Sequence, residues 1–137
     1  MSLNTIRTTI EATVAAEMAS APTYSVAYNN TTYSPPNHAT WVRCTVQFGD
    51  SGYATLLAPS GGRNMQTGTV ALDIFSPIGT GTGDSLTIAD RLKALFQRQI
   101  LSGLAFDPVV GPSIIQPSVH EGFYQLQLTS TFEAYLN

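Results

Sequence analysis

The sequence has 137 residues, of which hydrophobic residues make up an ordinary 43% and charged residues only 11%. Its formal net charge is −3 and its six Lys and Arg residues are dispersed, which disfavours a nucleic-acid-binding surface because such surfaces need clustered cations. A chain of this length can bury one hydrophobic core, so we expect a single domain over residues 1–137.

The low charge predicts that other chains cover much of the surface, since soluble monomers normally carry a mixed charged exterior. A monomer with a Thr- and Ser-rich exterior is the alternative interpretation. The amino terminus lacks the basic-then-apolar pattern of a signal peptide, and no apolar run approaches the roughly 18 residues of a membrane span. We therefore expect a soluble protein that is made in the cytoplasm and contacts no membrane.

The first predicted element is a helix over residues 4–19. Ile6, Ile10 and Val14 recur at helical spacing, and Ser2 is a suitable amino-terminal cap. A short alternating strand over residues 24–28 follows, and it leads into a polar turn that ends at Pro35-Pro36.

The next strand is predicted from Trp41 to Phe48, because apolar and polar residues alternate along it. Cys44 has no partner for an internal disulfide and falls on the apolar face, where we expect it to be buried. Trp41 and Arg43 fall on the opposite face. Either Trp41 folds over the sheet edge while Arg43 is solvated, or both residues anchor an interface, where Trp and Arg are enriched. The face predicted to join the core consists of Val42, Cys44, Val46 and Phe48.

Residues 49–64 are rich in Gly, Ser and Pro and predict a long excursion that forms a loose hairpin. Tyr53, Leu56 and Leu57 lie within it, and these apolar side chains would gain no burial energy if they stayed exposed to solvent. We expect this segment to dock on a partner.

A second alternating strand is predicted over residues 68–77, followed by a glycine-rich loop and an amphipathic helix from Asp84. A long alternating strand is predicted over residues 124–136. The order of these elements predicts an α+β fold, with a mostly antiparallel sheet and two helices packed on one face.

No catalytic constellation stands out in the sequence. The glycine-rich loop from Gly79 lacks the spacing of a phosphate-binding loop, and His38 and His120 have no neighbours at metal-ligand spacing. The scattered aspartates, Asp73 included, are expected at the surface, and a buried Cys44 offers no nucleophile. We expect a non-enzymatic protein with no catalytic, cofactor-binding or metal-ligating residues.

Three segments in fixed order resemble the small tail terminator, or tail completion, proteins of tailed bacteriophages. They are Asn30 to Pro36, which fits Asn-x-x-Tyr-x-Pro-Pro; Trp41-Val42-Arg43; and Gly68 to Gly81, which fits Gly-x-Val-x-Leu-x-Ile-Phe-x-Pro-x-Gly-x-Gly. The residues beyond Leu101 match no such motif.

The resemblance implies a virion protein at the head-proximal end of the tail. Such a protein would form a homo-oligomeric ring, generally a hexamer, that caps the tail tube, stops its growth and joins the head-side connector while DNA only passes through the lumen. The alternatives are a head-closure or neck adaptor protein, a small soluble enzyme or ligand-binding domain, and a nucleic-acid-binding module. We assign candidate interaction roles to Trp41, Arg43, Tyr53, Leu56, Leu57, Arg63, Ile78, Arg91 and Arg98.

Overall fold

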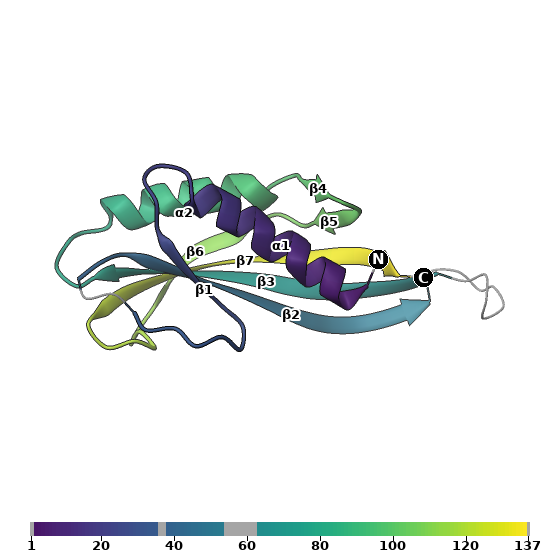
Figure 1. Cartoon of the computed structure of the whole chain (residues 1–137), viewed down its shortest axis with the longest axis horizontal. Coiled ribbons are helices and arrows are strands. Elements are labelled where there is room, and N and C mark those ends of the chain that lie inside the picture. The colour runs from purple at the N-terminus through teal and green to yellow at the C-terminus, as the bar shows by residue number, and fades with distance from the viewer. Residues whose placement is uncertain (1, 36–37, 54–62, 137) are drawn as a thin grey trace.

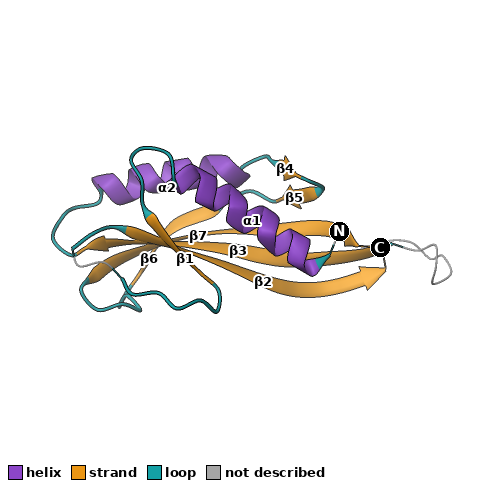
Figure 2. Cartoon of the chain, in the orientation of Figure 1, coloured by secondary structure: helices purple, strands orange, loops and turns teal. Residues whose placement is uncertain are grey.

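The computed structural model describes residues 2–35, 38–53 and 63–136, and Figures 1 and 2 show the arrangement. Two helices and seven strands make up the described part of the chain. In chain order they are α1 (Leu3–Met18), β1 (Ser25–Tyr28), β2 (Trp41–Tyr53), β3 (Asn64–Pro77), α2 (Gly83–Phe96), β4 (Ile100–Leu101), β5 (Leu104–Phe106), β6 (Val110–Ile115) and β7 (Phe123–Leu136).

Both predicted helices are present, and both lie on the same face of the sheet (Figure 1). Ser2 caps α1 as predicted, since its hydroxyl accepts a hydrogen bond from the Thr5 amide at 3.1 Å. The spacing of the apolar residues places one stripe of each helix against the sheet. The stripe of α1 consists of Ile6, Ile10, Val14 and Met18, and that of α2 includes Ile88, Ala89, Leu92 and Phe96.

The strands form one sheet in the order β1-β2-β3-β7-β5-β4, with β6 also paired to β7. The α+β prediction is confirmed, but the sheet is mixed, because β1 and β2 run parallel while the other pairs are antiparallel. The sheet is also curled. Parallel neighbours need a long crossover connection, and residues 29–40 supply it between these two strands.

The hairpin of β2 and β3 extends further than predicted, so the expected loose excursion over residues 49–64 is wrong at both ends. Strand β2 continues to Tyr53 and β3 begins at Asn64, while residues 54–62 lie outside the described part. A β-bulge between Phe48 and Ser51 shifts the register of the two strands, and their pairing resumes at Ser51 and Gln66. The side chains of Gln66 and Thr67 donate to the carbonyl oxygens of Gly49 and Asp50 at 3.0 and 2.8 Å. We call residues 49–53 and 63–67 the hairpin arm.

The main core lies between the helices and the sheet, and it buries Cys44 as predicted. Phe48 is a correction, because its ring is 43% exposed and only its edge meets Phe132, with centroids 6.3 Å apart. It is the last residue of β2 that pairs in register before the bulge. Opposite it, Gly68 lies so close to Phe132 that a Cβ atom would stand 2.3 Å from the ring, so the core requires glycine there.

Candidate functional site: a groove at one end of the sheet

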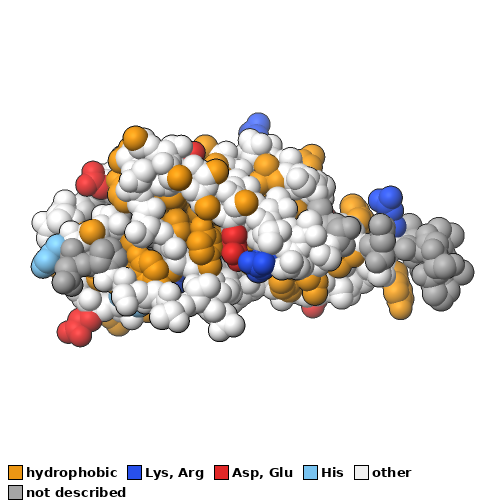
Figure 3. Space-filling model, viewed as in Figure 1, with side chains coloured by type: hydrophobic (Ala, Val, Ile, Leu, Met, Phe, Trp, Pro, Cys, Tyr) orange, Lys and Arg blue, Asp and Glu red, His pale blue; other side chains and the backbone are white. Residues whose placement is uncertain are grey.

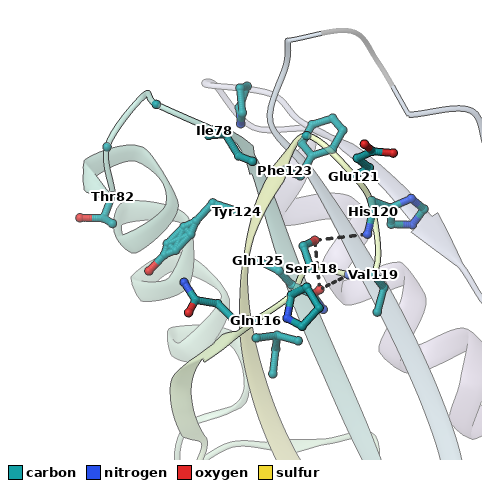
Figure 4. A pocket seen from close by; sticks show the side chains of 16 residues that line it. Ile78, Thr82, Gln116, Ser118, Val119, His120, Glu121, Phe123, Tyr124 and Gln125 are labelled. Carbon is teal, nitrogen blue, oxygen red and sulfur yellow. Dashed lines mark hydrogen bonds between the residues drawn. The ribbon is translucent and has the colours of Figure 1, made fainter.

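An open groove of about 1000 Å³ lies at the end of the sheet opposite the hairpin arm. Its walls are the turn after β3 and the loop between β6 and β7, and its floor is the start of β7 (Figure 4). Ile78 and Val119, on the two walls, are 69% and 61% exposed, although both are apolar. Phe123 and Tyr124 contribute half-buried rings to the floor. We call this cavity the end groove.

Hydrogen bonds hold the two walls of the end groove in place. The Ile78 amide donates to the Gly122 carbonyl at 3.2 Å, which ties the turn after β3 to the loop before β7. Within that loop, the side-chain oxygen of Gln125 accepts from the Val119 amide at 3.1 Å and from the Ser118 hydroxyl at 3.3 Å (Figure 4). These bonds fix the shape of the groove within a single subunit. Part of that shape depends on the orientation of the Gln125 side-chain amide.

Asp73 fixes that orientation from below the groove. Its carboxylate accepts from Gln125 at 2.8 Å, from Gln127 at 3.1 Å and from two nitrogens of Arg43 at 3.1 and 3.3 Å. The expectation that Asp73 lies at the surface is wrong, since it is 1% exposed. Burial of a carboxylate is costly unless donors surround it, and these side chains provide the donors. Arg43 and Asp73 face each other across β2 and β3.

An aromatic cluster lies beside this network on the face of the sheet without helices. Trp41 stacks between Phe75, at 4.2 Å between centroids, and Tyr33, at 5.0 Å. The ring of His120 from the groove wall stands edge-on to Trp41 at 4.9 Å. Burial, and secondly the charge of Arg43, lower the pKa of His120 below its usual value. The lowered pKa favours the neutral imidazole, which packs against Trp41 at the groove wall.

Three of the candidate interaction residues have their side chains engaged inside the subunit. Trp41 is 1% exposed within the aromatic cluster, and Arg43 pairs with Asp73. Arg91 pairs with Glu17 at 3.0 Å and donates to backbone carbonyls at the end of α1. These side chains orient elements of the subunit, and in this conformation the Trp41 ring offers almost no surface to a partner.

The other described candidates are exposed, but they lie at different places. Tyr53 is 84% exposed and, like the exposed Arg63, belongs to the hairpin arm. Ile78 lies on the groove wall at the opposite end of β3, and Arg98 is exposed after α2. Leu56 and Leu57 fall outside the described residues. The structure thus brings Ile78 into a site with the β6–β7 loop, which sequence reasoning did not include.

The described side chains offer little for catalysis or metal binding. No three His, Cys, Asp or Glu residues among them form a group that could hold a metal ion. Burial, with a smaller effect of Glu11, raises the pKa of Cys44 to about 12, so its thiolate is scarce at neutral pH. Neither helix within the described ranges has the length and apolarity needed to cross a membrane.

Comparisons with known proteins agree with the motifs in the sequence. One solved structure shares 24% sequence identity with the chain and superimposes with a TM-score of 0.71, over 100% of this chain and 98% of the other. At that identity the likeness shows the fold alone. None of the curated proteins compared matches the chain. A family described as "Phage tail terminator protein" matches residues 5–125, which include most of the first helix, the second helix, the strands β1 to β6 and the groove loops. The chain belongs to this phage tail terminator family and so has a role in phage tail assembly as part of the virion.

Proposed function

We propose that this protein caps the head-proximal end of the tail tube, ends tube polymerisation and provides the surface to which the head connector joins. It acts as a homo-oligomeric ring, generally a hexamer in this family, between the major tail tube protein and a head-side neck protein. The observation that carries the proposal is the family match over residues 5–125. The role is structural, without a cofactor, and DNA only passes through the lumen.

The surface of the subunit supports an assembly role. Exposed apolar side chains are present at both ends of the long sheet, with Tyr53 on the hairpin arm and Ile78 and Val119 on the end groove, and others such as Ile100 and Val110 lie outside the arm and the groove. Exposed apolar groups that line one groove, as Ile78 and Val119 do, are typical of interaction sites. Both ends therefore fit contacts with neighbouring virion proteins, and Arg98 is a further candidate contact.

The charge distribution supports passage of DNA without tight binding. Arg7, Arg43 and Arg91 each pair with a carboxylate of the same subunit, which leaves fewer cations to neutralise phosphates. The face of the sheet without helices carries mainly Thr and Gln side chains from β2, β3 and β7. We expect no salt-dependent, micromolar binding of duplex DNA by the isolated protein, and such binding would favour the nucleic-acid alternative.

Removal of the gene from the phage tests the function. Without a terminator, tail tubes continue to polymerise, so electron microscopy of lysates should show overlong tubes of variable length that lack heads. Complementation with the wild-type gene should restore a single tail length. Tails of normal length that fail to join heads would instead indicate a head-closure or neck adaptor protein. Normal virions would contradict both assignments.

A further inference from the structure

The two ends of the subunit differ in shape. Strand β3 has 14 residues and spans roughly 45 Å, with the hairpin arm at its start and the end groove just after its last residue. The arm projects beyond the helices, whereas the other end holds the groove (Figures 1 and 4). Because the strand separates them, the arm of one subunit cannot reach its own groove.

The two ends also complement each other chemically. Tyr53 presents an aromatic ring with a terminal hydroxyl, and the groove combines apolar walls at Ile78 and Val119 with polar groups such as Gln116 and Thr82. A tyrosine suits such a site because its ring can be buried while its hydroxyl finds a polar partner.

The charges at the two ends of the subunit also favour a contact between the arm and the groove. Charged side chains are sparse on the face that Figure 3 shows. The exposed carboxylates of Asp84 and Glu121 lie at the groove end, whereas the arm carries the exposed cation Arg63 and the acidic Asp50. The groove end is therefore acidic and the arm is neutral with an exposed cation. Opposite potentials on two surfaces steer their encounter and set their register.

We propose that the hairpin arm of one subunit docks in the end groove of a second copy of this chain, with Tyr53 in the groove and Arg63 facing Glu121. The contact is head-to-tail, because it uses two different surfaces, and repetition of such a contact closes into a ring when the rotation between copies allows it. This inference rests on the proposed ring and assigns the subunit contact that builds it.

Disulfide trapping tests the contact in the full chain. The variant Tyr53→Cys/Val119→Cys places one thiol on the arm and one in the groove, while the native Cys44 is buried and protonated at neutral pH. Mild oxidation of the purified protein and of purified tails should give a ladder of covalent dimers and higher oligomers on non-reducing gels. The matched control Tyr53→Cys/Ile100→Cys uses Ile100, which is 74% exposed and lies outside the groove, and should give no ladder.

Charge reversal gives a second, independent readout. Arg63→Glu or Glu121→Arg in the trapping variant should lower the yield of covalent oligomer on the order of ten-fold, and the double reversal should restore it. Absence of a ladder in both the purified protein and the tails, or an equal ladder from the Ile100 control, would overturn the proposal. Trapping is independent of tail length. A ladder in the purified protein together with normal tails after gene removal would therefore retain the contact while rejecting the terminator function.

Discussion

Replacement of Asp73 tests whether the buried carboxylate holds the end groove together. In Asp73→Ala, Gln125 loses the acceptor that orients its amide and Arg43 loses its ion-pair partner. The Gln125 amide could then reorient, and its oxygen would no longer accept the hydrogen bonds from Ser118 and Val119 in the groove wall. We expect both a less stable protein and a more mobile β6–β7 loop.

The expected loss of stability depends on how exposed each hydrogen-bond partner of Asp73 is. Gln125 is 2% exposed, so its unpaired amide costs about 1–3 kcal/mol, whereas Arg43, with its side chain 32% exposed, can recover part of its hydration. With the lost charge-assisted bonds, we expect a decrease of about 3 kcal/mol in the free energy of unfolding. Unfolding entropy per residue, applied to 137 residues, converts this to a fall of about 10 °C in Tm.

Thermal and urea unfolding followed by circular dichroism measure the change. The matched control is Asp90→Ala, since Asp90 is exposed on α2, and its effect should stay within about 0.5 kcal/mol. Amide hydrogen exchange should show faster exchange of Val119 in Asp73→Ala. Equal midpoints for the two variants, with unchanged exchange at Val119, would refute the role assigned to the Asp73 network.

Three further predictions concern the core and the helix contacts. Leu128→Asp should cost several kcal/mol because Leu128 is fully buried, whereas Thr129→Asp on the half-exposed opposite face should be mild; equal urea midpoints would show that the register of β7 is wrong. Arg91→Ala should lower stability by about 2 kcal/mol, because it releases Glu17 and carbonyls after α1; an unchanged Tm would contradict this. Burial raises the pKa of Cys44 from 9.0 to about 12, so deprotonation favours the unfolded chain and stability should fall between these pH values. At pH 8 the native thiol should resist iodoacetamide until urea unfolds the chain, and rapid alkylation of the folded protein would contradict its burial.

The elements with long, regular patterns were predictable from the sequence. Ile6, Ile10 and Val14 set the buried stripe of α1, and the alternation around Val70 and Leu128 sets the core face of β3 and β7. The local spacing of apolar residues is enough to predict these elements, because it decides which side chains share a face. The short strands β4, β5 and β6 were not predicted, since they are stabilised by pairing with β7 and with each other more than by a pattern of their own.

The candidate site depended on contacts between distant segments and was only partly predictable. The sequence placed Arg43 and Asp73 on polar faces of two strands, and this alternation was the available signal for their ion pair. It could not show that Gln125 would complete the network and bury the carboxylate. For the same reason Trp41 could be an interface anchor or a packed residue until Phe75 and Tyr33 were placed on either side of it.

Imaging of the assembled virion at subunit resolution tests the central claim most directly. We expect one ring of this fold between the last ring of the tail tube and the head-side connector, recognisable by its two helices on one face of a long, curled sheet. The same fold repeated along the tube, or found only at the distal end of the tail, would contradict a terminator role.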